Sequence, residues 1–330
     1  MTTRTRYFVI ASLLVLTVGV GTGLVAYYVG YQASASQGPD ELRLVPPDAA
    51  LVAFADVSAV MVSQVRQKLL QVLPSRGRGQ QEFQDQTGIN IETDIDRVIA
   101  CLTPSHENGQ TAMSGMVLAR GRFDEVKIEG LMRAHGAHVE DYKGKRLLTA
   151  DVTAGPRANS FSLAFLEPGL VAVGSTEVVR AGVDRSTGGE NITSSAEVMD
   201  FVRSFDGNAW AVGRFDTLTA QVKLPPGVAS QIPPITWFAA SGRVDSGLSG
   251  TLRADTNDET AAENLRDVIR GVVALAKLQT AAHPELQPMV ESLLLGGTSK
   301  TVTLSFDLSA EMFDRLATTL QSFSRGRVAR

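Results

Sequence analysis

The sequence predicts an α+β protein in which an N-terminal transmembrane helix precedes two similar units, each an antiparallel sheet covered by helices. Three observations support this fold class. A long uncharged apolar segment lies near the N-terminus, short strand patterns alternate with helical patterns after it, and a strand-then-helix design recurs in the second half. Hydrophobic residues make up 44% of the 330 residues and charged ones 20%, which is ordinary for a packed domain.

The apolar segment at residues 8–29 contains no charged residue. A helix of this length spans about 33 Å, enough to cross the hydrocarbon core of a bilayer. We therefore expect a cytoplasmic N-terminus at residues 1–6, a transmembrane helix at residues 7–30 and a linker at residues 31–44. The expected membrane anchor is carried by Phe8, Leu14, Gly19, Gly23, Tyr27 and Tyr28.

Two further features of this segment bear on its fate. Ala33-Ser34-Ala35 fits a signal-peptidase pattern, so cleavage after Ala35 is the alternative to an anchor, although signal-peptide apolar regions are shorter. Gly19 and Gly23 have the spacing of a close helix pair, so helix–helix self-association in the bilayer stays open beside a lone anchor. The basic residues of the N-terminus precede the segment, which predicts that the rest of the chain lies outside the cytoplasm.

The first unit is expected over residues 45–190, as strands and helices that alternate after the linker. Apolar runs bounded by turn residues indicate the strands, and a 3.6-residue period with capping residues indicates the helices. The expected elements are a strand at 50–56, a helix from Ser58, a strand at 113–119, a helix at 124–135 ended by Gly136, a hairpin turning at Lys143-Gly144, a strand pair turning at 167–169 and a helix at 175–185.

The second unit is expected over residues 191–330 and begins with "NAWAVGRFDTLTAQV", which repeats the strand-then-helix design of "ALVAFADVSAVMVSQV". Further strands are expected in "TWFAASGRV", "GLSGTLRAD" and "TVTLSFDLS". Thr256 and Glu259 have capping-box spacing and predict a helix start. The stripe that this helix presents on one face is Leu265, Val268, Ile269, Val272 and Leu275.

Four stretches of the chain carry a resemblance to known proteins. They are "LRLVPPDAALVAFADVS", "TGINIETDIDRVIACL", "DYKGKRLLT" and "FLEPGLVAVGSTEVVRAGVDR". Over residues 44–185 the chain resembles bacterial membrane-anchored envelope proteins classed as domains of unknown function, which share a Leu-Pro-x-Asp start and a Tyr-x-Gly hairpin. This chain has Val-Pro-Pro-Asp at the start. The resemblance implies an envelope location and transfers no catalytic residue. Together with the N-terminal apolar segment, it leads us to expect a single-pass protein of the bacterial inner (cytoplasmic) membrane.

Residues with catalytic or metal-binding potential are few. His135 and His138, with Glu140 and Asp141 nearby, form the one cluster of metal-ligand types, but Gly136 places the histidines on different elements, which favours surface side chains. Cys101 stands in an apolar run and is expected to be a buried thiol. The spacing of a nucleotide loop, a Walker loop and a nucleophile elbow is missing, so we expect no cofactor, and the net charge of −4 disfavours nucleic acid.

These observations favour a non-enzymatic, membrane-anchored envelope protein whose exterior domain binds or scaffolds another envelope component. The bilayer is the expected partner of the N-terminal helix. One alternative is a hydrolase or metal-dependent enzyme with a site near His135, His138 and Asp141. Another is a carrier that encloses an apolar ligand between helices and sheet.

Overall fold

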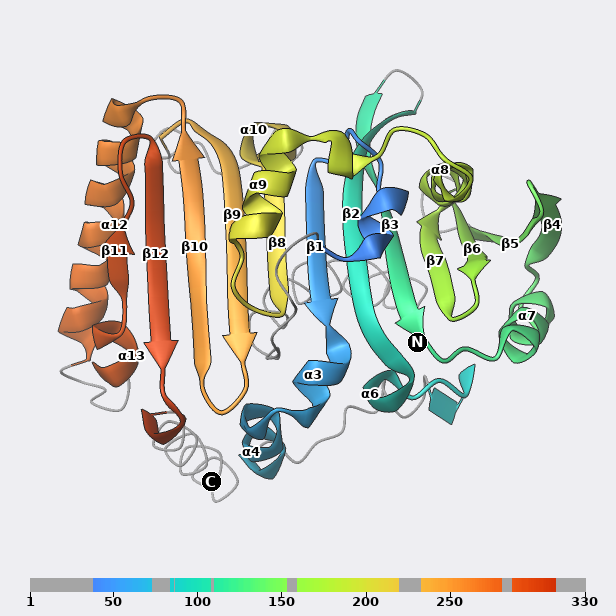
Figure 1. The fold of residues 1–330 in the computed structure, drawn as a ribbon, viewed down its shortest axis with the longest axis horizontal. Coiled ribbons are helices and arrows are strands. Elements are labelled where there is room, and N and C mark those ends of the chain that lie inside the picture. Colours follow the sequence, from blue (N-terminus) through green and yellow to red (C-terminus); the bar gives the residue numbers. More distant parts are fainter. Residues whose placement is uncertain are drawn as a thin grey trace, which may run out of the picture. The chain divides into compact units, whose positions relative to one another are not determined.

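The computed structural model describes residues 38–72, 84–85, 87–107, 110–152, 159–219, 233–280 and 287–312. These residues belong to two compact units (Figure 1). Unit 1 takes in residues 38–58 and the described residues of 84–204. Unit 2 takes in residues 59–72 and the described residues of 205–312. Twelve strands lie in the described residues, and the sheet pairings described within each unit are antiparallel.

Unit 1 holds seven strands in the order β1-β2-β3-β7-β6-β5-β4. Their bounds are β1 (Leu51–Asp56), β2 (Ile95–Glu107), β3 (Gln110–Gly121), β4 (His138–Tyr142), β5 (Lys145–Val152), β6 (Asn159–Glu167) and β7 (Leu170–Ser175). After β3 the chain forms β4, β5 and β6, and then β7. Strand β7 pairs with β3, from Met116↔Gly174 to Arg120↔Leu170. Neighbours in this sheet are therefore not always neighbours in sequence.

The helices of unit 1 are short, and they precede, connect or follow these strands. They are the 3₁₀ helix η2 (Asp40–Leu44), α6 (Ile91–Asp94), α7 (Glu125–Ala134), α8 (Thr176–Ser186), the 3₁₀ helix η3 (Ile192–Ser194) and α9 (Ala196–Ser204). The expected start and end of α7 are confirmed: the Asp124 side chain accepts a hydrogen bond from the Lys127 N–H, and Gly136 has a φ of +87°. Helix α3 (Val57–Val62) follows β1.

Both faces of this sheet are buried where β3, β6 and β7 meet. Ile128 of α7 packs with Leu163, Phe165 and Val171 on one face. Successive side chains of a strand point to opposite faces, so Ala164 and Ala172, which are 0% exposed, belong to the other face. Helix α8 covers that face, since a Cβ added at Gly182 would meet the side chain of Met116. Figure 1 shows α8 lying across the ends of β6 and β7.

Unit 2 holds five strands in the order β11-β12-β10-β9-β8. Its elements are α4 (Gln64–Val72), β8 (Ala209–Arg214), α10 (Phe215–Thr219), β9 (Ile235–Val244), β10 (Leu248–Thr256), α12 (Glu259–Gln279), α13 (Gln287–Glu291), β11 (Leu294–Gly296) and β12 (Thr301–Leu308). Helix α12 packs Ala262 and Leu265 against Val302 of β12, with Ala254 and Leu295 around them. In Figure 1 this helix runs beside β11 and β12.

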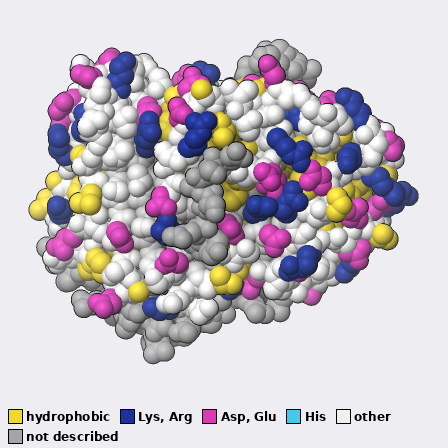
Figure 2. All heavy atoms as spheres, viewed as in Figure 1, with side chains coloured by type: hydrophobic (Ala, Val, Ile, Leu, Met, Phe, Trp, Pro, Cys, Tyr) yellow, Lys and Arg dark blue, Asp and Glu magenta, His cyan; other side chains and the backbone are white. Residues whose placement is uncertain are grey.

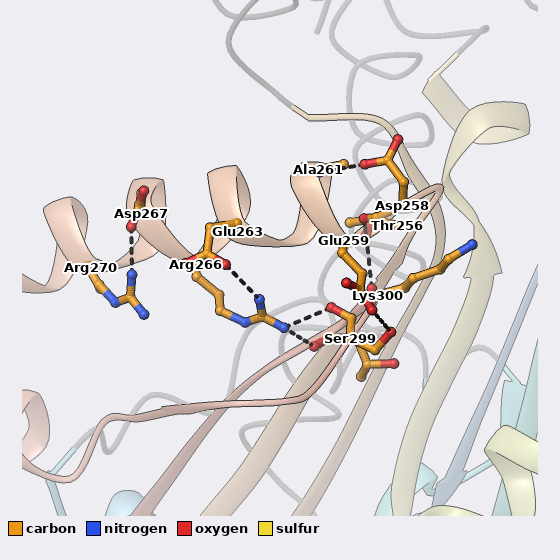
Figure 3. A network of polar contacts seen from close by, with 11 residues as sticks. Thr256, Asp258, Glu259, Ala261, Glu263, Arg266, Asp267, Arg270, Ser299 and Lys300 are labelled. Carbon is orange, nitrogen blue, oxygen red and sulfur yellow. Dashed lines mark hydrogen bonds and ion pairs between the residues drawn. The ribbon is translucent and has the colours of Figure 1, made fainter.

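The first turn of α12 is fixed by polar contacts that Figure 3 shows from close by. Asp258 is the N-cap, and its Oδ1 accepts a hydrogen bond of 2.7 Å from the Ala261 N–H. Arg266 donates to the carbonyl oxygens of Ser299 and Thr301, each at 3.0 Å, which ties the helix to the turn before β12. The expected capping box is wrong: Glu259 accepts a hydrogen bond from the Ser299 hydroxyl instead of returning to Thr256.

The predicted fold class is wrong in its architecture, although the chain does contain both helices and strands. Unit 1 has seven strands in a sheet that helices cover on both faces, whereas unit 2 has five strands, so the units are not two similar copies. The part of the chain that the structure describes is dominated by antiparallel sheet. The error arises because a short apolar run in the sequence marks only part of a strand. The strands β2 and β3 extend over 13 and 12 residues.

The N-terminal part of that prediction lies outside the described residues. This applies to the anchor residues Phe8, Leu14, Gly19, Gly23, Tyr27 and Tyr28. Among the helices that the structure does describe, none combines the length and the apolar character needed to cross a membrane. The last five residues of the expected linker form η2, in which Leu42 and Leu44 are fully buried.

The N-cap of α12 can be tested by substitution. Asp258→Ala removes the side-chain acceptor of the Ala261 N–H, so we expect a loss of about 1 kcal/mol in the free energy of unfolding. Asp267→Ala, which removes an exposed i,i+3 pair with Arg270 on the same helix, is the control and should cost less than about 0.5 kcal/mol. Urea denaturation of both variants measures this difference. Equal losses would contradict the cap.

Candidate functional site

The histidine cluster that the sequence singles out is divided between two elements. His135 is the C-cap of α7, and its Nδ1 lies 2.8 Å from the carbonyl oxygen of Leu131. His138 begins β4, is exposed, and lies opposite Thr149 of β5. Both side chains are therefore explained by local structure: one closes a helix and the other faces solvent.

Asp141 also has a local role. Its Oδ1 accepts a hydrogen bond of 3.0 Å from the Gly144 N–H, in the turn that joins β4 to β5. Lys143 and Gly144 have φ values of +52° and +75°, the left-handed pair that a two-residue hairpin turn requires. No group of three or more histidine, cysteine or acidic side chains that could hold a metal occurs within the described part of the chain.

Cys101 is the only cysteine of the chain, and the structure places it in β2, 2% exposed. Its expected burial is confirmed. Burial raises the pKa of this thiol to about 12, and a hydrogen bond with the backbone of Met116 only partly offsets that rise. The thiolate is therefore scarce at neutral pH, which makes Cys101 a poor nucleophile.

A cluster of ion pairs in unit 1 surrounds Glu41, the charged residue that is buried in the described part of the chain. The Glu41 side chain is 3% exposed; its Oε1 accepts a hydrogen bond from Arg120 and lies 3.2 Å from the Arg97 guanidinium. Glu167 accepts hydrogen bonds from Arg43 and, at 3.3 Å, from Arg120. These contacts join η2 to β2, β3 and β6, four elements that are far apart in the sequence.

We call this cluster the clasp, and its role is structural. Its members are Glu41, Arg43, Arg97, Arg120 and Glu167. Burial alone would raise the pKa of Glu167, but hydrogen bonds from Arg43 and Arg120 outweigh it and hold that pKa below its usual value. The pKa of Arg120 is raised, because its bonds to Glu41 and Glu167 outweigh the opposing effect of burial. A carboxylate kept ionised by arginines is suited to hold a segment in place, and it is a weak general base.

A second set of charges fastens the β4–β5 hairpin to α8. Lys143 lies 2.7 Å from Asp184, and the Tyr142 hydroxyl donates to the same carboxylate at 3.4 Å. Arg180 lies over the Tyr142 ring, 5.4 Å from its centroid, and pairs with Glu140. A hydrogen bond from Lys143 lowers the pKa of Asp184. These partly exposed pairs contribute little each but together restrain the hairpin.

Acidic and basic side chains are interspersed on the face of the molecule that Figure 2 shows. Exposed ion pairs that the structure describes include Arg203 with Asp200 and Arg270 with Asp267. This face therefore presents no broad field of a single sign. Helix α12 carries a surface that is unusual for a packed domain, because it exposes apolar side chains.

Helix α12 exposes a stripe of aliphatic side chains in its C-terminal half. Val268, Val272, Leu275 and Leu278 are 48%, 61%, 62% and 73% exposed. At 100° per residue these four side chains fall within an arc of about 120°, and they form what we call the α12 stripe. The sequence pattern grouped Leu265 with Val268, Val272 and Leu275, but Leu265 is 9% exposed and faces the sheet.

This helix therefore has two adjacent apolar faces. Ala262, Leu265 and Ile269 pack toward β10 and β12, and the α12 stripe lies beside them on the surface. A Cβ added at Gly271, within the stripe, would meet nothing within 4 Å, so this part of the helix surface is open. Exposed apolar side chains that gather on one helix face mark an interaction site more often than scattered ones do.

Comparisons with known proteins add little to this geometry. The chain matches no family model, and no curated protein matches it. A solved structure titled "Structure of crystal form I of TP0453" is 10% identical and aligns with 88% of this chain and 99% of its own, with a TM-score of 0.43. A TM-score of this size does not establish a shared fold.

The clasp predicts a large effect of one substitution on β3. Arg120→Met leaves the buried Glu41 with Arg97 as its remaining arginine, so we expect a loss of about 2 kcal/mol in the free energy of unfolding. Arg122→Met is the control, since Arg122 is exposed and lies 3.8 Å from Asp94. It should cost less than about 1 kcal/mol. Similar urea midpoints for the two variants would show that the clasp is not a stabilising unit.

The lowered pKa of Glu167 predicts a pH dependence. Its ionised form is favoured in the folded state, so its contribution to stability is present above the pKa of an unfolded glutamate, about 4.3, and is lost as pH falls through the lower native pKa. Glu167→Gln should therefore reduce the urea midpoint more at pH 7 than at pH 3. Glu263→Gln, an exposed position, controls for the loss of one carboxylate. A pH-independent difference for Glu167→Gln would contradict this account.

Proposed function

We propose that the protein is a non-enzymatic, membrane-anchored protein of the bacterial envelope whose exterior part binds another envelope component through unit 2. The observation that carries this proposal is the α12 stripe, in which Val268, Val272, Leu275 and Leu278 are exposed on one side of a 21-residue helix. Holding aliphatic side chains in water is unfavourable, by roughly 25 cal/mol for each Å² of apolar surface. A partner that covers the stripe removes that penalty.

Two expectations from the sequence support the location. The uncharged segment at residues 8–29 is long enough for a membrane anchor, and Arg4 and Arg6 precede it. Residues 44–185 resemble bacterial envelope proteins that are anchored in this way. The envelope is also where an exposed aliphatic surface meets lipids and membrane proteins at high local concentration.

The local roles of the candidate catalytic residues support a binding function over a catalytic one. His135 closes α7, Asp141 closes a hairpin turn, and the pKa of Cys101 is about 12. Glu41 and Glu167 are held by arginines. Each of these side chains is already used for structure in the part of the chain that is described.

Location is tested with the full chain in bacterial cells. We expect the protein in the inner-membrane fraction and a reporter fused after Arg330 to be active outside the cytoplasm. Deletion of residues 8–29 should abolish membrane retention. A reporter that is active in the cytosol, or a full chain that is recovered without membrane, would overturn the location.

Binding is tested in the same cells by photo-crosslinking from the α12 stripe. A photoreactive residue at Leu275 should crosslink to an envelope lipid or an envelope protein, because its side chain is 62% exposed. The control is the same residue at Glu263, which is exposed on the same helix but outside the stripe. Equal crosslinking from both positions, or none from Leu275, would count against unit 2 as the binding surface.

A further inference from the structure

We draw no further inference here: the strongest candidate, the α12 stripe of exposed aliphatic side chains on the C-terminal half of that helix, carries nothing beyond the proposed binding role, because nothing in the structure shows what covers it.

Discussion

The buried carboxylate of Glu41 is the interaction on which the edge of unit 1 depends. A charge that is 3% exposed is costly unless cations meet it, and Arg97 and Arg120 supply them from β2 and β3. This pairing holds η2 against the sheet, so that Leu42 and Leu44 are fully buried. Helix α8 can then pack beside η2, because Gly182 leaves room for the Leu44 backbone and the Met116 side chain.

Burial of both faces follows from this arrangement and explains the composition of the strands. In β6, Leu163 and Phe165 pack toward α7, whereas Ala164 is buried on the opposite face, and Leu166, at the irregularity before Glu167, is also fully buried. An antiparallel strand with one wet face would alternate apolar and polar residues, but a strand covered on both sides is apolar at nearly every position. The run "SLAFL" in β6 therefore indicates a strand that is buried on both faces of the sheet. This pattern is more familiar from parallel sheets.

Unit 2 uses its long helix differently. The first three turns of α12 are held by the Asp258 cap, by Arg266 and by the packing of Ala262 and Leu265. The later turns present Val272 and Leu275 to the surface, although these residues belong to the same apolar pattern. The helix is thus anchored at one end and free to offer an apolar side at the other, which is the physical basis for assigning a binding role to it.

Sequence alone determined the features that depend on neighbours in the chain. Asp124 and Gly136 mark the two ends of α7, because helix caps depend on residues close in sequence. Lys143 and Gly144 form the hairpin turn, because this turn needs two residues with positive φ. Tertiary structure decided what depends on distant partners: the pairing of β3 with β7, the cover on both faces of unit 1, and the side of α12 that packs. A 3.6-residue period shows that residues share a helix face, but only the position of the sheet determines whether that face is buried.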